Sequence, residues 1–122
     1  MLEFINEQMA VLQIPYEFMQ WTQKVVYPYT VGEYADVPTS NEDGSEESKF
    51  ILTVTTRGKW IELEEIKNKI KQHFPSVYGL RGKTDSGSIA VFFSDAYPVP
   101  TGEADLKRLQ INLTIYEWKG VS

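Results

Sequence analysis

The strongest constraint on the fold is a run near the end of the sequence in which apolar and polar residues alternate strictly. The apolar members are Leu109, Ile111, Leu113 and Ile115, and the polar ones are Gln110, Asn112, Thr114 and Tyr116. Because the side chains of a strand point alternately to its two faces, this run predicts a strand over 107–118 with one face in the core. A sheet that is buried on one face only is usually antiparallel.

Two segments have the periodicity of amphipathic helices. In 60–74 apolar residues recur every three or four positions, with glutamates and lysines between them, and Pro75 ends the pattern because proline cannot continue a helix. A shorter helix is predicted over 2–12, with its apolar face made by Leu2, Ile5, Met9 and Leu12. We expect both helices to cover one face of the sheet.

The other apolar segments are rich in β-branched and aromatic residues, as is typical of strands. They are 16–35, 49–56, 77–81 and 88–94. Pro28 lies in the first of them and has no N–H to donate, so that strand is expected at a sheet edge or with a bulge. The prediction is an α+β fold with a mostly antiparallel sheet, two helices on one face, and the order of about α-β-β-β-α-β-β-β.

Length and composition restrict the domain count and the partners. The 122 residues fit a single domain over 1–122, with the polar, acidic segment at about 36–48 as a mobile loop. The net charge is −5, and twelve scattered basic residues face seventeen acidic ones. Phosphate backbones require clustered Lys and Arg, so we expect no direct nucleic-acid partner but a basic protein surface. No apolar run approaches the ~20 residues that span a bilayer, and the first residues lack a signal-peptide pattern, so no membrane partner is expected.

The residues that usually carry catalysis or bind metals do not form a recognisable site. The sequence has no cysteine and one histidine, His73, whose place near a helix end favours a structural cation. Gly82-Lys83-Thr84 is similar to the end of a phosphate-binding loop, but position 77 is Val where that motif has Gly. We therefore predict no catalytic residue, no cofactor, no metal and no enzymatic activity.

Two groups of residues are candidates for a protein interface. The first is acidic and lies in the expected loop, where it either is simply solvated or docks on a basic partner and becomes ordered. It comprises Glu42, Asp43, Glu46 and Glu47. The second is aromatic and lies on expected strands, where it forms either a second packing layer or a contact surface. It comprises Tyr27, Tyr29, Tyr34, Tyr116 and Trp118.

The layout as a whole resembles one family of phage proteins. The features that carry the resemblance are the helix over 2–12, the aromatic stretch Val25-Val26-Tyr27-Pro28-Tyr29-Thr30-Val31-Gly32-Glu33-Tyr34, a long polar loop, the helix over 60–74 and the closing strand. They are similar to the tail terminator and tail-completion (head–tail joining) proteins of long-tailed phages, including minor tail protein U-like members. The stretch over 27–34 also looks like small proteins from tail-gene modules of prophages.

The resemblance implies a structural protein of virion assembly, located in the virion and, during assembly, in the host bacterial cytoplasm. Its partners would be itself, in a ring expected to be a hexamer, and other tail or connector proteins. The ring would stop growth of the tail tube and join it to the head. The resemblance transfers no catalytic residue.

Two alternatives stay open from the residues alone. An acidic α+β domain also suits a small protein-binding module, such as an adaptor or an anti-host-defence protein. A small enzyme with an unrecognised carboxylate pair, for instance Glu33 with Asp95, is the other alternative, although no spacing favours this pair.

Overall fold

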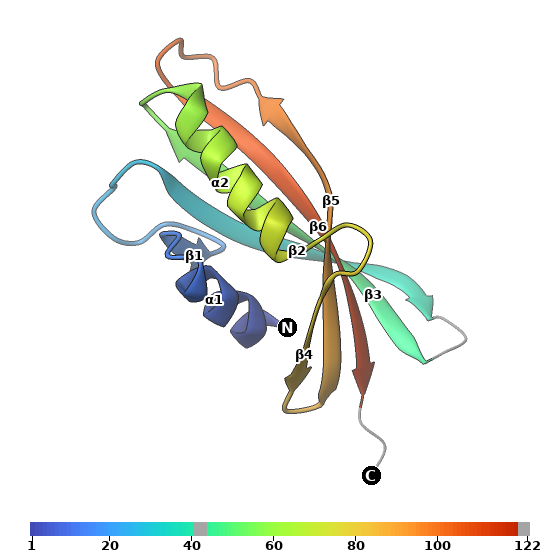
Figure 1. Cartoon of the computed structure of the whole chain (residues 1–122). Coiled ribbons are helices and arrows are strands. Elements are labelled where there is room, and N and C mark those ends of the chain that lie inside the picture. The colour runs from blue at the N-terminus through green and yellow to red at the C-terminus, as the bar shows by residue number, and fades with distance from the viewer. Residues whose placement is uncertain (41–43, 120–122) are drawn as a thin grey trace.

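The computed structural model describes residues 1–40 and 44–119, which form an α+β fold with two helices and one six-stranded mixed sheet (Figure 1). The elements before the chain midpoint are α1 (Leu2–Val11), β1 (Tyr16–Phe18), β2 (Tyr29–Ser40) and β3 (Ser45–Thr56). They are followed by α2 (Trp60–His73), β4 (Leu80–Thr84), β5 (Gly87–Val99) and β6 (Lys107–Lys119).

The strands lie in the order β1-β2-β3-β6-β5-β4, and four of the five neighbouring pairs are antiparallel. The exception is β1, which pairs in parallel with β2 over three residues after the chain returns through 19–28. The predicted α+β class and the predominance of antiparallel pairing are therefore confirmed. The three strands expected before the second helix and the three after it do not form separate groups, since β3 and β6 pair along their full length and unite all six.

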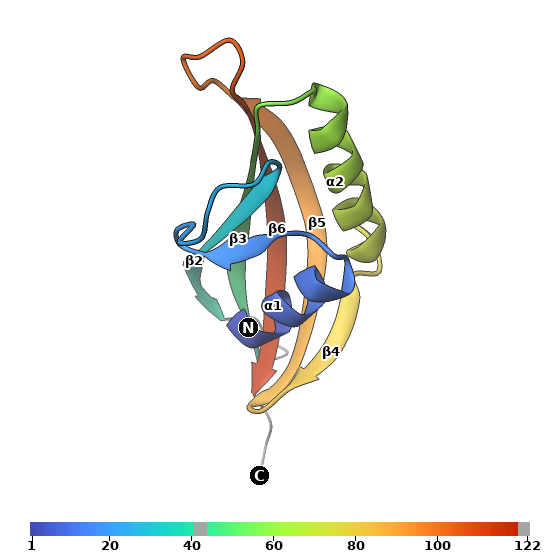
Figure 2. The ribbon, with the colours of Figure 1, turned by 90° about the vertical axis from the view of Figure 1, so that its left-hand side faces the viewer.

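Both helices pack on the same face of the sheet and share one hydrophobic core with it (Figures 1 and 2). The predicted alternation of 107–118 is correct, because Leu109, Ile111, Leu113 and Ile115 are buried. Their partners are Phe50, Leu52 and Val54 of β3, Ile89, Val91 and Phe93 of β5, Phe4, Ile5 and Met9 of α1, and Leu63, Ile66 and Ile70 of α2. Each fully buried side chain of this kind contributes about 1.5–3 kcal/mol.

The second helix is fastened to the sheet at both of its ends. At its start, the Glu62 carboxylate accepts hydrogen bonds from the N–H of Lys59 (3.1 Å) and from the hydroxyl of Thr56 (3.0 Å). At its end, Phe74 is fully buried and its carbonyl accepts the N–H of Phe93 from β5 at 2.9 Å. The helix thus satisfies terminal backbone groups that would otherwise lack partners.

The acidic segment is the largest departure from the predicted elements. A loop was expected over 36–48, whereas β2 continues to Ser40 and β3 begins at Ser45. The start of β3 pairs with the end of β6, and Ser45 and Ser48 are buried. This pairing with a distant strand overrides the local polar composition. Residues 41–43 lie outside the described part of the chain.

Other boundaries moved for similar reasons. Pro28 lies just before β2, after a cis peptide bond with Tyr27, so its expected place within a strand was wrong. The strand itself has the expected irregularity, a register shift between Asp36 and Ser40, and it pairs with β1 over 30–32 only. β5 continues past the predicted end at 94 to Val99, because a bulge between Phe93 and Asp95 lets it keep pairing with β6.

Candidate protein-interaction surfaces

One face of the sheet, here called the open face, lies opposite the two helices. The pairing register gives its side chains, since partners in adjacent strands share a face. Ile51, Asn112 and Asp95 form one row across β3, β6 and β5. Phe92 and Thr114 form another row, and Tyr116 follows two residues after Thr114 on the same face. The described part of the chain places no helix over this face (Figure 2).

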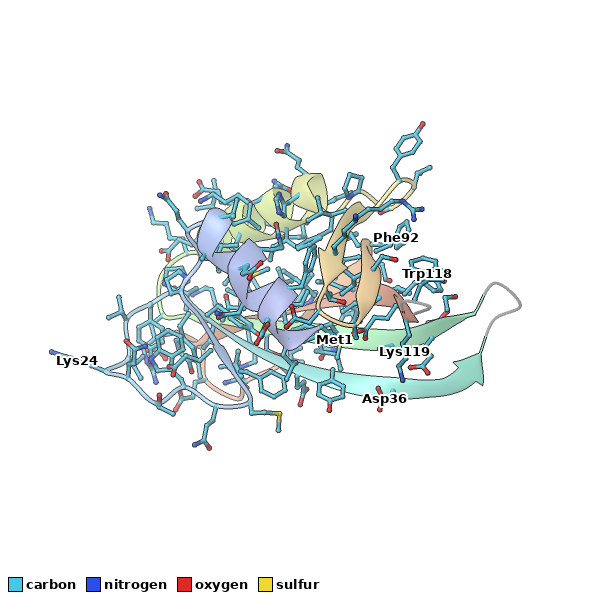
Figure 3. All side chains as sticks on the ribbon, turned by 90° about the horizontal axis from the view of Figure 1, so that it is seen from below. Met1, Lys24, Asp36, Phe92, Trp118 and Lys119 are labelled. Atoms are coloured by element: carbon cyan, nitrogen blue, oxygen red, sulfur yellow. The ribbon has the colours of Figure 1, made fainter. Side chains whose placement is uncertain are left out.

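Three aromatic side chains of the open face make contact, and we call them the aromatic patch. Phe92 meets the edge of Tyr116 with ring centroids 5.7 Å apart, and Tyr116 meets Trp118 at 6.3 Å. All three are half-buried. Figure 3 shows Phe92 and Trp118 at the end of the molecule opposite Lys24. Aromatic residues that are only partly covered are enriched at protein interfaces.

The connection from α2 to β4 extends the aromatic patch. Gly79 has a positive φ of 67°, and a methyl group at this position would lie 2.7 Å from the Phe92 ring, so only glycine permits this approach. The two residues before it, Val77 and Tyr78, are 79 % and 78 % exposed. Neighbouring large apolar residues with this exposure add to the contact area at this end of the sheet.

A polar row lies beside the aromatic patch on the same face. Gln110 donates to the hydroxyl of Tyr97 (2.7 Å) and to the side-chain carbonyl of Asn112 (3.1 Å). Asn112 in turn donates to Asp95 at 2.7 Å. The bulge in β5 places Ser94 on this face too, 2.5 Å from the hydroxyl of Thr114. These groups line a shallow hollow of about 380 Å³.

Arg57 joins three loops at the opposite end of the sheet. Its guanidinium donates to Asp105 (2.8 Å), to Glu103 (3.2 Å) and to the hydroxyl of Tyr27 (3.2 Å). The hydrogen bonds with Tyr27 and then with Asp105 raise the pKa of Arg57. Tyr27 packs against Tyr29 with centroids 5.7 Å apart. Arg57 thereby fixes the segment 19–28, where Val25 and Val26 are exposed.

The structure distributes the predicted interface residues over several places. Tyr116 and Trp118 lie together in the aromatic patch, as their shared strand face predicts. Tyr27 and Tyr29 lie at the Arg57 end, and Tyr34 lies on the helix side of the sheet, stacked on Phe18 at 6.0 Å.

The acidic candidates are only partly placed. Glu46 and Glu47 belong to β3, and Glu46 lies 3.8 Å from Lys119 in an exposed ion pair. Such a pair contributes at most about 1 kcal/mol. Glu42 and Asp43 lie outside the described residues.

The suggested carboxylate pair is not brought together. Glu33 and Asp95 occupy one row across the open face, but Ile51 and Asn112 stand between them. Three strand spacings separate the two backbones by about 14 Å. Asp95 instead accepts a hydrogen bond from Asn112.

His73 has a different role from the cation expected at a helix end. Its Nε2 lies 2.7 Å from Oε1 of Gln8, which joins α2 to α1. Burial lowers the pKa of His73, so the neutral ring is favoured.

Sequence reasoning missed two important residues. Phe92 lies in the run Ile89-Ala90-Val91-Phe92-Phe93, where every residue is apolar and alternation cannot tell the two faces apart. Arg57 has partners 30, 46 and 48 residues away, and no local pattern indicates them. Pairing Phe92 with the predicted outward face of β6 would have found the first.

Metal sites, membrane-spanning helices and similarity to known proteins were each checked for this chain. In residues 1–40 and 44–119, no group of three or more His, Asp or Glu is arranged to hold a metal ion. No helix in this part of the chain has the length and apolar character needed to cross a membrane. Comparison of the sequence with the models of known protein families gives no match, and comparison with curated proteins gives none either.

Proposed function

We propose that this chain is a structural protein of virion assembly from a long-tailed phage or prophage. In this role it forms a ring, expected to be a hexamer, that terminates the tail tube and joins it to the head. Its place is then the virion and, during assembly, the bacterial cytoplasm. The proposal derives from the resemblance to tail terminator and tail-completion proteins.

The observation that carries the proposal is the open face with its aromatic patch. A sheet covered by helices on one side only has an apolar and a polar surface available on the other. Ring-forming subunits need contact surfaces of this kind on two different parts of the molecule, because each copy touches its neighbours through unlike surfaces. The aromatic patch and the Arg57 end are two such unlike surfaces at opposite ends of the sheet, since Trp118 pairs with the first residue of β3 and Arg57 follows its last.

Charge gives a second, independent support. With a net charge of −5, the chain favours basic protein surfaces over nucleic acid. Glu47 of β3 pairs with Tyr116 of β6, which places its carboxylate on the open face beside the aromatic patch. A joining protein that docks there would meet an acidic side chain beside aromatic ones.

The test uses tail tubes purified from the phage or prophage that encodes the chain. The purified protein is added to tubes that lack their terminal structure, and tube ends are viewed by negative-stain electron microscopy. The proposal predicts a cap at one end of each tube and tubes of one length in an assembly reaction. Tubes that keep growing without caps would contradict it, and a stable complex with an unrelated protein would favour the adaptor alternative.

A matched pair of variants sharpens the test. Trp118→Ala removes a ring of the aromatic patch, and it should reduce capping by at least about tenfold if the patch is a contact. Trp60→Ala removes an exposed ring of the same size on α2, and it should leave capping unchanged. Equal effects of the two substitutions would show that the aromatic patch has no special part in capping.

A further inference from the structure

Strand β4 at one edge of the sheet and strand β2, next to the short strand β1 at the other edge, carry opposite charges on the same face. On β4, at one edge, Arg81 and Lys83 are exposed and pair with Ala90 and Ser88, which places them on the open face. On β2, Glu33 is exposed and pairs with Ile51, which places it on the open face too. Four strand spacings, or about 19 Å, separate these two strands within one chain.

The backbone of β2 offers hydrogen-bonding groups at its outer edge beyond the short strand β1. The N–H of Thr30 donates to the Pro15 carbonyl, and the carbonyl of Gly32 accepts from the N–H of Met19. The even-numbered residues of β2 therefore direct their backbone N–H and C=O groups outward, away from β3. This alternation continues to Tyr34 and Asp36, because the pairing with β3 stays regular through Asp36. β1 covers only 30–32, which leaves the edge from Glu33 onward for another strand.

On β4 the odd-numbered residues direct their backbone outward. Thr84 and Gly87 close a two-residue hairpin, and in such a turn the closing pair exchanges its hydrogen bonds. Alternation then turns the backbone of Thr84, Gly82 and Leu80 toward β5 and that of Lys83 and Arg81 away from it.

These two patterns admit only one kind of pairing between the edges. In an antiparallel pair, residues directly opposite each other either both direct their backbone N–H and C=O groups at the partner strand or both direct them away. Tyr34 would then stand opposite Arg81, yet their side chains lie on opposite faces of the sheet, so the two cores would face in opposite directions. In a parallel pair an outward-directed residue stands opposite an inward-directed one, such as Gly82. Both cores then stay on one side.

The strand directions lead to the same result. Four antiparallel steps connect β2 to β4, so these two strands run in the same direction within one chain. A rotation about an axis roughly along the strands preserves that direction and brings β4 of one copy to β2 of the next as a parallel neighbour. Such a contact joins two unlike surfaces and can close into a ring.

We propose that β4 of one copy adds to the free edge of β2 in a second copy as a parallel strand, with Leu80 of the first opposite Tyr34 of the second and Arg81 opposite Ala35. Among the registers that keep both cores on one side, this is the first in which β4 stays clear of Gly32, the last residue that pairs with β1. It puts Arg81 on the diagonal from Glu33, within reach of two long side chains. The inference rests on the self-assembly part of the proposed function, and it names the contact.

A charge exchange measured by sedimentation velocity at low salt tests the contact. Arg81→Glu and Glu33→Arg should each weaken self-association by about tenfold, and the double variant should restore it. Because about 19 Å separates the two positions within one chain, such a rescue must act between copies. Lys69→Glu on α2 is the matched control, with the same charge change and no expected effect.

A backbone variant tests the parallel pairing separately. Lys83→Pro removes an N–H that faces away from β5, so the monomer should fold with an unchanged far-ultraviolet circular dichroism spectrum while self-association is lost. Normal self-association of the folded Lys83→Pro chain would overturn the proposal.

The outcomes separate this inference from the proposed function. Self-association that ignores the charge exchange would refute the contact but leave ring formation in place. A charge-dependent oligomer that does not cap tail tubes would support the contact and refute the proposed function. A chain that stays monomeric at every concentration would refute the contact.

Discussion

His73 and Gln8 join the two helices through a side-chain hydrogen bond of 2.7 Å, although 65 residues separate them. The contact lies at the border of the core that both helices share with the sheet. The neutral tautomer with its proton on Nε2 can donate to the Gln8 carbonyl oxygen, and burial lowers the pKa of the ring. Because burial disfavours the charged ring, protonation of His73 costs the folded chain stability, even though Nε2 keeps its proton in either state.

The first prediction concerns acid stability. A histidine whose pKa is lowered by folding adds stability above its unfolded pKa of about 6.5, and this stability is lost as the pH falls through the folded pKa. His73→Gln keeps an N–H donor for Gln8 but cannot titrate. Urea unfolding at about pH 7.5 and about pH 5 should show a smaller loss of stability for His73→Gln than for the parent chain. An equal loss in both chains would contradict the role given to His73.

The second prediction concerns Gly32 in β2. A methyl group there would lie 2.6 Å from the Tyr16 hydroxyl and 2.7 Å from the Phe50 ring, both of which pack over the glycine. Gly32→Ala should therefore lower the free energy of unfolding by about 1–3 kcal/mol, measured by urea denaturation. Ala35→Gly changes one methyl group on the exposed part of the same strand and should cost less than about 1 kcal/mol. A Gly32→Ala chain of unchanged stability would show that Tyr16 and Phe50 do not pack tightly over Gly32.

The third prediction compares two buried hydroxyl groups. Within the described residues, Thr30 Oγ1 is buried without a hydrogen-bond partner. Thr56 Oγ1 donates to Glu62 and accepts the N–H of Gly58, both at 3.0 Å. Thr30→Val should leave stability unchanged or raise it by up to about 1 kcal/mol, whereas Thr56→Val should lower it by about 1–3 kcal/mol. Thermal unfolding of both variants checks the difference. A larger loss of stability for Thr30→Val than for Thr56→Val would refute the hydrogen bonds assigned to the two hydroxyl groups.

The fourth prediction concerns Arg57. Arg57→Ala removes the bonds to Tyr27, Glu103 and Asp105, so hydrogen exchange should become faster in the segments 19–28 and 100–106. Protection in α2 should stay the same, since that helix has its own bonds to Thr56 and Phe93. High salt should produce part of the same effect in the parent chain, because the pairs are exposed. Unchanged exchange in 19–28 would mean that Arg57 does not hold this segment.

The sequence predicts the fold better in its long periodic segments than in its polar ones. The strand predicted over 107–118 and the helix predicted over 60–74 agree with β6 and α2. In both segments a regular apolar pattern repeats over many residues, so it identifies the buried face without ambiguity. The strands in 36–48 were missed because Ser45 and Ser48 are buried by pairing with β6, which a local pattern cannot show.

For the candidate surfaces too, local alternation placed some residues correctly, whereas others needed the pairing of distant strands. Tyr116 and Trp118 were placed on one face by alternation alone, and the structure confirms that they are neighbours. Tyr34 was assigned with them by residue type, but the register of β2 puts it on the helix side. The opposite charges of Glu33 and Arg81 near the two edges need the strand order, which one sequence does not provide.

Native mass spectrometry of the purified chain over a range of concentrations tests the central claim most directly. Assembly through unlike surfaces on opposite edges predicts one closed oligomer with a fixed number of copies, expected to be six, and no larger species as the concentration rises. A chain that remains monomeric up to about 1 mM would contradict the account.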